Sequence, residues 1–259
     1  MILISMEKII KHYAYGYCEE FRLTKDQAHK PELILTFETI RKYLKSGMKI
    51  LELGAGTGAY SIQLAKDGYD VTAVELVKHN LDILKSRINP NMRITPILGT
   101  ATNLKMLGDK QFDIVLSLGP MYHLKKNDRL KSLKESIRVC KRNGIIIFAF
   151  VSNYSCVGEY FKNNIRAILN DKIINKNDFH FVDNVFTFVT IAEIEDLFKQ
   201  VKLQKVELLS PDGISRLLKD EINKFNEKEF ELWLDYLRKT ANDTSLVGYG
   251  GHVLYVAKK

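Results

Sequence analysis

The chain has 259 residues, of which 46% are hydrophobic and 27% are charged, a balance typical of one large globular α/β domain. Its net charge of +8 could indicate a nucleic-acid partner, but the lysines alternate with acids and form no dense basic block. We interpret the charge as a solvated surface, so nucleic acid is an open but less favoured partner.

The cysteines and the apolar stretches exclude further classes. Cys18, Cys140 and Cys156 show no paired or metal-site spacing, which predicts neither a disulfide framework nor a metal site and favours a reducing cytosol. The longest apolar stretches, such as 145–151, are far below the roughly 20 residues that span a bilayer. The first residues are typical of neither a signal peptide nor an anchor. We expect a cytoplasmic protein without a membrane partner.

Apolar runs alternate with helical periodicity through the first 150 residues. A helix is predicted over about 31–44, with Pro31 in its first turn. Predicted strands then cover 49–53, 70–75, 93–98, 112–118 and 144–151, and predicted helices cover 60–66, 77–88 and 129–140. This alternation predicts a parallel sheet with helices on both faces.

The rhythm changes after residue 151. Residues 155–169 read as a helix, and 179–189 alternate around an Asp183–Asn184 turn like a hairpin. Thr190 and Glu193 have capping-box spacing, which predicts a helix to Phe198. Two late strands are predicted over 205–209 and 252–257, and the apolar residues from 214 to 237 follow helical spacing. We interpret 152–190 and 211–245 as helical covers on a single domain, 1–259.

The stretch ILELGAGTGAY, residues 50–60, places glycines at 54, 56 and 58 directly after a predicted strand. Glycines let the backbone turn sharply and approach a ligand closely. The next strand ends in Glu75, at the distance from which a carboxylate binds ribose hydroxyls. Together these features predict an adenosine site that includes Gly54, Gly56, Gly58 and Glu75.

The spacing distinguishes between adenosine cofactors. Dinucleotide sites favour G-x-G-x-x-G, whereas this sequence reads E-x-G-x-G-x-G. Glu52 would repel a pyrophosphate, but it suits the ammonium and sulfonium charges of S-adenosyl-L-methionine. A nicotinamide dehydrogenase is therefore disfavoured.

Three further stretches join this pattern: FDIVLSLGPMYHL, CKRNGIIIFAF and GYGGHVLYVAKK. With them, most of the chain resembles the class I S-adenosylmethionine-dependent methyltransferases, and the G-P-x-Y-H-L ending resembles a bacterial branch of that family. The resemblance implies a Rossmann-like doubly wound sheet of seven strands in the order 3-2-1-4-5-7-6, with strand seven antiparallel.

The resemblance also implies roles for the residues at the methionine end of the cofactor. The backbone of Gly54, Ala55 and Gly56 should face the methionine part. Glu52 should anchor the ammonium group, and the carbonyl of Leu118 should accept from it.

At the adenosine end, the resemblance implies that Glu75 holds both ribose hydroxyls and that Leu76 packs on the adenine. Relatives commonly place an Asp within GDA for the adenine amino group, but this chain has Thr100 there. The hydroxyl of Thr100 and the amide of Ala101 are the remaining candidates.

The catalytic candidates are His123 and Tyr122, just past the fourth predicted strand. His123 could take a proton from a nucleophile or could be a structural residue, and the sequence leaves both interpretations open. Tyr13 and Arg22 lie in residues 1–30, where many relatives carry a lid. Arg22 could bind the methionine carboxylate, but packing of the tyrosines onto the domain is an equal alternative.

The sequence predicts methyl transfer to a small-molecule acceptor by direct in-line displacement. The alternatives are an RNA or protein methyltransferase, which usually carries a basic stripe or added binding domain, and a regulatory protein that binds the cofactor without transferase activity. Aromatic side chains in the covers suggest a partly apolar acceptor: Tyr154, Tyr160, Phe161, Phe179, Phe181, Phe186, Phe188 and Trp233. The acceptor and the oligomeric state are not predicted.

Overall fold

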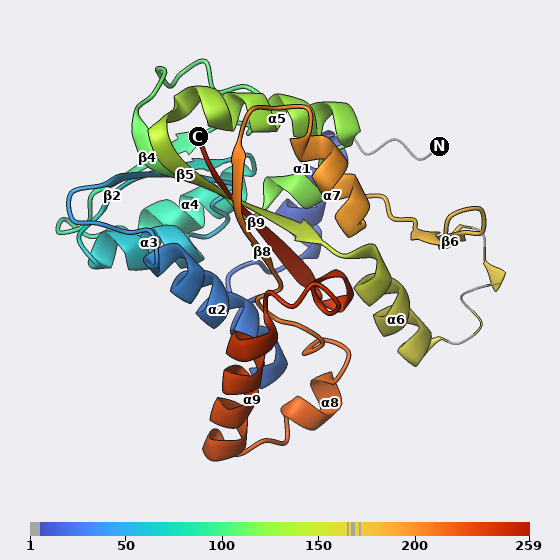
Figure 1. Cartoon of the computed structure of the whole chain (residues 1–259). Helices are drawn as coiled ribbons and strands as arrows, with labels where there is room; N and C mark the ends of the chain where they lie inside the picture. Colours follow the sequence, from blue (N-terminus) through green and yellow to red (C-terminus); the bar gives the residue numbers. More distant parts are fainter. Residues whose placement is uncertain (1–5, 165, 167–168, 171) are drawn as a thin grey trace.

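The structure is a computed structural model that describes residues 6–164, 166, 169–170 and 172–259. These residues form a seven-stranded sheet with helices on both faces, as Figure 1 shows. The alternation of strand and helix patterns predicts this α/β architecture.

The strand order in the sheet is β3-β2-β1-β4-β5-β9-β8. The strands, in that order, span Ile94–Leu98, Asp70–Glu75, Lys49–Leu53, Phe112–Ser117, Cys140–Val151, His252–Lys258 and Gln204–Leu209. Strands β1 to β5 pair in parallel, and β9 pairs antiparallel with both β5 and β8. The predicted order 3-2-1-4-5-7-6, with an antiparallel seventh strand, is confirmed.

The helical segments begin and end within a few residues of most predicted ones. They are α1 (Met6–Lys11), the π-helical turn η1 (His12–Gly16), η2 (Gln27–His29), α2 (Lys30–Arg41), α3 (Ala59–Lys66), α4 (Lys78–Ser86), η3 (Pro120–Tyr122), α5 (Lys126–Val139), α6 (Asn153–Asn163), α7 (Ile191–Phe198), α8 (Lys219–Ile222), α9 (Glu227–Thr240) and η5 (Val247–Tyr249). The predicted capping box is present at the start of α7, where Thr190 and Glu193 bond each other's backbone.

The central strand β1 lies between β2 and β4 and aligns the loops that follow these three strands. Its apolar side chains are buried because strands and helices cover it on all sides; Leu51 and Leu53 are fully buried. Leu53 lies opposite Val74 of β2 and Ser117 of β4. The loops that follow β1, β2 and β4 therefore meet at one edge of the sheet.

The predicted hairpin around Asp183–Asn184 is wrong. The Asp183 carboxylate accepts the N–H groups of Val185 and Phe186, both at 2.7 Å, so it stabilises a local turn rather than a strand pair. The observed hairpin pairs β6 (Ile174–Asn175) with β7 (His180–Phe181), on the N-terminal side of that turn.

The cover segments also differ from the predicted ones in detail. The helix predicted over 155–169 is α6, which starts earlier because Ser152 caps it; residues 165, 167 and 168 lie outside the described residues. The helical pattern over 214–225 becomes only the short α8. Leu234 and Leu237 of α9 pack on Leu35 of α2, so this apolar series is mainly the core of a cover.

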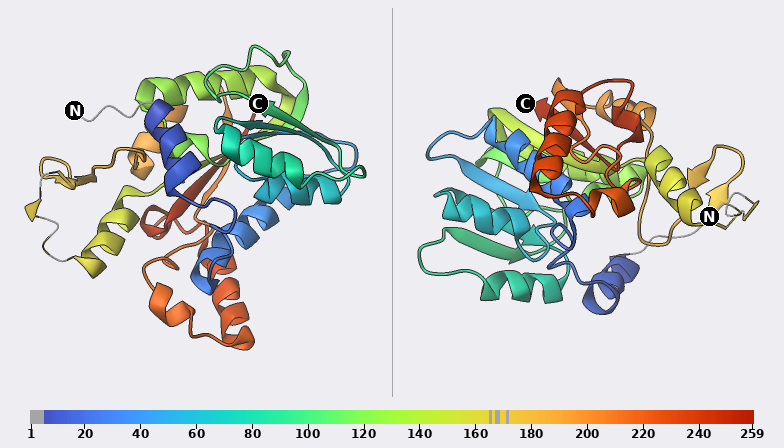
Figure 2. Two further views of the ribbon diagram at one scale, coloured as in Figure 1. Left: turned by 180° about the vertical axis from the view of Figure 1, so that it is seen from behind. Right: turned by 90° about the horizontal axis from the view of Figure 1, so that it is seen from below.

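Figures 1 and 2 show where the covers lie. Helices α8 and α9 extend from one end of the molecule beside α2, and α6 and the β6–β7 hairpin lie on another side. An ion pair at 2.9 Å between Arg238 and Glu38 joins α9 to α2. Helix α9 thus contacts α2, and α6 directly follows the end of β5.

Candidate active site

The turn after β1 has backbone geometry that requires glycine. Gly54 and Gly56 have φ values of +68° and +55°, which L side chains rarely adopt. A Cβ atom on Gly54 would lie 2.8 Å from Cδ of Pro120, which follows β4. The turn and the loop after β4 therefore approach each other closely, and a bare backbone faces the space between them.

Glu75 ends β2 and holds this turn. Its carboxylate accepts the N–H of Gly56 and the N–H of Val77, both at 2.8 Å. Burial raises the pKa of Glu75, and these hydrogen bonds oppose the rise. Since a carboxylate can accept about four hydrogen bonds, Glu75 keeps capacity for a ligand.

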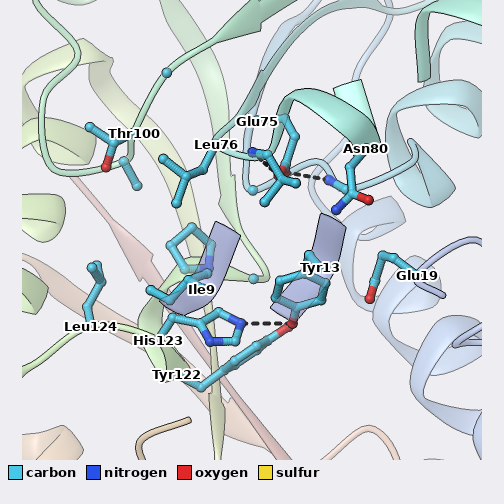
Figure 3. A pocket seen from close by; sticks show the side chains of 17 residues that line it. Ile9, Tyr13, Glu19, Glu75, Leu76, Asn80, Thr100, Tyr122, His123 and Leu124 are labelled. Carbon is cyan, nitrogen blue, oxygen red and sulfur yellow. Dashed lines mark hydrogen bonds between the residues drawn. The ribbon is translucent and has the colours of Figure 1, made fainter. Parts of the chain in front are cut away.

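A first cavity of about 650 Å³ opens over the turn and Glu75 (Figure 3). Nine predicted site residues line it: Tyr13, Gly54, Gly56, Glu75, Leu76, Thr100, Ala101, Tyr122 and His123. We call it the adenosine cavity. The hydroxyl of Thr100 lies 3.1 Å from that of Thr102, so it has a local partner.

A second, smaller cavity of about 350 Å³ adjoins the first one at Gly54 and Tyr122. It gathers the other predicted residues for the methionine end: Glu52, Ala55, Leu118 and Arg22. We call it the methionine cavity. Predicted residues from β1, from the segments that directly follow β1 and β4, and from the N-terminal segment thus lie around one space.

Glu52 is buried in this second cavity, and its partner is the hydroxyl of Ser61, which donates to it. Burial raises the pKa of Glu52 to about 8, and the nearby charge of Glu75 adds to the rise. The carboxyl group is therefore largely protonated at neutral pH until a cation approaches it.

Arg22 differs from the predicted free two-pronged donor. Its Nε donates to Glu19 at 3.0 Å and its Nη1 to Glu32 at 2.8 Å. Two of its nitrogens are therefore committed to acids of the protein. Arg22 still lines the methionine cavity, so a carboxylate there would meet a guanidinium that is held in place.

Gly58 lines none of the cavities described here. It has a φ of +90°, and a Cβ atom on it would lie 2.3 Å from Cδ1 of Leu84. We attribute this glycine to close packing of the turn against α4, and not to contact with a ligand as the sequence predicts.

A third cavity of about 940 Å³ is the largest of the three. Its wall combines aromatic rings with charged groups, and of the eight cover aromatics only Phe186 and Phe188 line it. Tyr154 and Phe179 are about half exposed, and Trp233 donates to Ser215 and packs in the α9 cluster. We call this space the acceptor cavity, after the methyl acceptor that the sequence predicts.

Tyr122 lines all three cavities, and Tyr13 lines the adenosine and acceptor cavities. Tyr122 is nearly buried, at 7% exposure, just after β4. The three spaces therefore meet at the position of this side chain.

Both ring nitrogens of His123 have partners. Nδ1 lies 2.9 Å from the carbonyl of Val185, which can only accept, so Nδ1 carries the proton. Nε2 then accepts from the hydroxyl of Tyr13 at 2.9 Å (Figure 3). Burial lowers the pKa of His123 to about 4, so the ring is neutral at pH 7.

Sequence reasoning missed several residues of the adenosine cavity, above all Glu19 and Asn80. Oε2 of Glu19 is buried and has no hydrogen-bond partner among the described residues. Cγ of Glu19 would lie 3.2 Å from a Cβ atom on Gly56, so this side chain covers the turn. Neither residue belongs to a sequence motif. Glu19 lies in the loop between η1 and η2 and Asn80 in α4, and only the fold brings them to the cavity.

Three potential metal ligands, Glu32, Asp212 and His252, gather within 4.8 Å of one another in the interior, where the sequence predicts no metal site. Nδ1 of His252 lies 2.7 Å from Asp212 and 3.4 Å from Glu32. Burial opposes protonation, but Glu32 and Asp212 raise the pKa of His252. Because Nδ1 faces carboxylate oxygens, which can only accept, it carries a proton and cannot ligate a metal in this arrangement.

Comparison with known proteins bears on this site. Residues 50–144, which contain the turn, Glu75, Tyr122 and His123, match a family model described as a methyltransferase domain. Residues 50–144 therefore match a methyltransferase domain, and the cofactor that such a domain implies is S-adenosyl-L-methionine. The glycine turn, Glu75 and the unpartnered Glu19 oxygen are consistent with this cofactor.

Relatives of the methyltransferase domain include YqeM of Bacillus subtilis (strain 168), a protein named as a methyltransferase. It is 27% identical to this chain over 168 residues, which are 61% of this chain. The chain spans 66% of the length of YqeM. A ubiquinone biosynthesis O-methyltransferase of Pelagibacter ubique (strain HTCC1062) is 26% identical over 200 residues, 77% of this chain and 72% of that protein.

A solved structure shares the fold of the domain. The S-adenosylmethionine-dependent methyltransferase from Leishmania major superposes with a TM-score of 0.63 at 16% identity, over 98% of this chain and 82% of that one. Among the described residues, no helix is long and apolar enough to cross a membrane.

Proposed function

We propose that this protein transfers a methyl group from S-adenosyl-L-methionine to a small-molecule acceptor by direct in-line displacement. The observation that carries the proposal is the position of Tyr122, at which the adenosine, methionine and acceptor cavities meet. A methyl donor and an acceptor that occupy these cavities would be neighbours at this point.

The residues around the first two cavities suit the cofactor. Glu75 and the backbone around Gly56 would bind the ribose, and Leu76 would pack on the adenine. Glu52 and the carbonyl of Leu118 would receive the ammonium group, opposite Arg22. When bound, S-adenosyl-L-methionine supplies a methyl group on a positively charged sulfur.

The contribution of the protein is then to orient the acceptor and to exclude water. Orientation of two reactants can supply on the order of 7–11 kcal/mol of the barrier, so no covalent catalysis by a side chain is needed. The buried ring of Tyr122 would shield the junction of the cavities from water. Helix α1 and η1 would act as a lid, because Ile9 of α1 and Tyr13 of η1 line the adenosine cavity.

For His123 we propose a positioning role. Its protonated Nδ1 is held by Val185, and its Nε2 is occupied by Tyr13, so the ring connects the lid to the cover segment. A role as general base would require Tyr13 to leave Nε2 first.

A small-molecule acceptor is favoured over RNA or protein because cover segments surround the acceptor cavity. Its lining includes residues of α6, of the segment before α7 and of the segment before α8. The P. ubique relative is named for ubiquinone biosynthesis, and we draw from it only that a small acceptor is compatible with this family.

Two finer assignments belong to the same proposal. The segment Gly119–Leu124 supports a place in the bacterial G-P-x-Y-H-L branch. The three free cysteines, Cys18, Cys140 and Cys156, support a reducing compartment such as the cytoplasm.

Two measurements test the proposal. Isothermal titration should detect binding of S-adenosyl-L-methionine and none of NADH. Incubation with labelled cofactor should then transfer label to a metabolite pool and not to RNA. Binding without labelling of any pool would favour a regulatory protein, and label in RNA alone would favour an RNA methyltransferase.

A further inference from the structure

The acceptor cavity has an uneven distribution of charge. Arg22, Lys25, Arg216 and His252 line it, against the single carboxylate of Glu159. Cations in a partly apolar cavity are costly unless acids or a ligand offset them. A cation in this wall that has no acidic partner in the protein is therefore a candidate to bind an anionic ligand.

Two of these cations are offset inside the protein. Arg22 forms ion pairs with Glu19 and Glu32, and His252 pairs with Asp212 at 2.7 Å. Arg22 and His252 therefore stabilise the wall of the cavity, and their charge is offset by acids of the protein.

Arg216 is less fully paired. Its Nη2 lies 3.6 Å from Oε1 of Glu159, which is beyond hydrogen-bond distance. Its Nε is buried and has no hydrogen-bond partner among the described residues. A guanidinium has five N–H donors, so Arg216 keeps several for a ligand.

Lys25 reinforces Arg216. Burial, and then the charges of Arg216 and Lys219, lower the pKa of Lys25, and the charge of Asp26 opposes this shift. The acids nearby are Asp26, which pairs with His29 and Lys219, and Glu159. Of these groups, Lys25, Arg216 and Glu159 line the cavity, so two cations face one carboxylate at this end.

The rest of the wall is largely aromatic. Rings of Tyr13, Tyr17, Phe186 and Phe188 line it, and Tyr122 marks the junction with the cofactor cavities. Rings of this kind bury flat apolar groups.

We infer that the methyl acceptor is an aromatic or otherwise apolar small molecule that carries a carboxylate or phosphate, held by Arg216 and Lys25. This inference rests on the proposed function, since it names the substrate class of the same site. Arg is suited to both oxyanions because its planar donors match their paired oxygens, and Lys25 adds a point charge.

Probe binding tests the inference without knowledge of the natural acceptor. We would titrate phenylphosphate, phenylacetate, benzyl alcohol and phenethylamine into the full chain, alone and with S-adenosylhomocysteine. The two anions should bind about tenfold or more tightly than benzyl alcohol, since charge-assisted hydrogen bonds are the stronger kind. The stronger of the two anions identifies phosphate or carboxylate as the preferred group.

Variants assign the effect to the residues. Arg216→Gln and Lys25→Gln should each reduce the preference for anions several-fold, and Arg216→Lys should retain part of it. Lys199→Gln is the matched control, because Lys199 is exposed on the surface and does not line the cavity. Lys25 is itself exposed, so its variant should fold even if Arg216→Gln does not.

The outcomes separate this inference from the proposed function. Equal binding of benzyl alcohol and the anions, tighter binding of phenethylamine, or no binding of either anion would overturn the inference. Titration with S-adenosyl-L-methionine reports on the proposed function independently. Cofactor binding without anion preference would reject the acceptor class alone. Anion preference without cofactor binding would reject methyl transfer and leave the cavity as an anion-binding site only.

Discussion

The carboxylate of Glu75 accepts the backbone N–H of Gly56 across 2.8 Å, so the acid that ends β2 holds the turn that follows β1. The residues are 19 positions apart in the sequence. Parallel pairing of β1 and β2 brings their carboxyl ends together and makes this contact available. A change at either residue should therefore affect both the turn and the cofactor.

Glu75→Ala should weaken binding of S-adenosyl-L-methionine by about 1–3 kcal/mol, because it removes charge-assisted hydrogen bonds to ribose and frees the turn. Isothermal titration would measure this loss. Glu135→Ala is the control: Glu135 also holds a loop, through the N–H of Leu104 at 2.7 Å, but lines none of the three cavities. Unchanged affinity in Glu75→Ala would reject the ribose role.

Binding of S-adenosyl-L-methionine should release protons near neutral pH. Glu52 has a pKa of about 8 in the cofactor-free protein, and an ammonium group beside it would favour the charged carboxylate. Affinity should rise from about pH 6 to about pH 8 and then level off. Titration in buffers with different ionisation enthalpies would count the protons released.

Glu52→Gln is the control for this pH dependence and should bind with an affinity that changes little with pH. The raised pKa also affects stability. In the unfolded chain Glu52 loses its proton near pH 4.5, but in the folded protein it keeps the proton up to about pH 8, so a rise of pH between these values favours the unfolded chain. Glu52→Gln should flatten that part of the unfolding profile. Proton uptake on cofactor binding would contradict the placement of Glu52 beside a cation.

Gly54→Ala should reduce cofactor affinity by about tenfold or more and destabilise the fold by about 1–3 kcal/mol, because the new methyl group meets Pro120 at 2.8 Å. Gly47→Ala is a matched control, since Gly47 also has positive φ, +78°, but open space around it. It should cost only about 1 kcal/mol and leave affinity unchanged. Equal effects of the two variants on binding would show that backbone strain alone is responsible.

Tyr13→Phe should loosen the lid, since it removes the hydrogen bond to Nε2 of His123. We expect faster hydrogen exchange of backbone amides in α1 and η1 and a higher KM for the cofactor. Tyr15→Phe is the control, because Tyr15 lies in the same turn and is 88% exposed. His123→Gln should resemble Tyr13→Phe if His123 positions the lid. A far larger fall of kcat in His123→Gln than in Tyr13→Phe would instead indicate a general base.

The sequence by itself determined the framework of the cofactor site. The bounds of β1 and β2 match the predicted ones because both strands are short apolar runs that end at a turn or a polar residue. The spacing of Glu52, Gly54, Gly56 and Glu75 predicted the ligand class, since each residue acts through a position relative to its own strand. Such local relations are visible in a linear pattern.

The tertiary structure alone decided how the remaining residues combine. Glu19 covers the glycine turn, Arg22 is committed to two acids, and the hairpin lies before Asp183 rather than around it. The junction of three cavities at Tyr122 and the pairing of Arg216 with Glu159 also join segments far apart in the chain. Contacts of this kind follow from the packing of helices and covers against the sheet, and packing of distant segments has no periodic signature in the sequence.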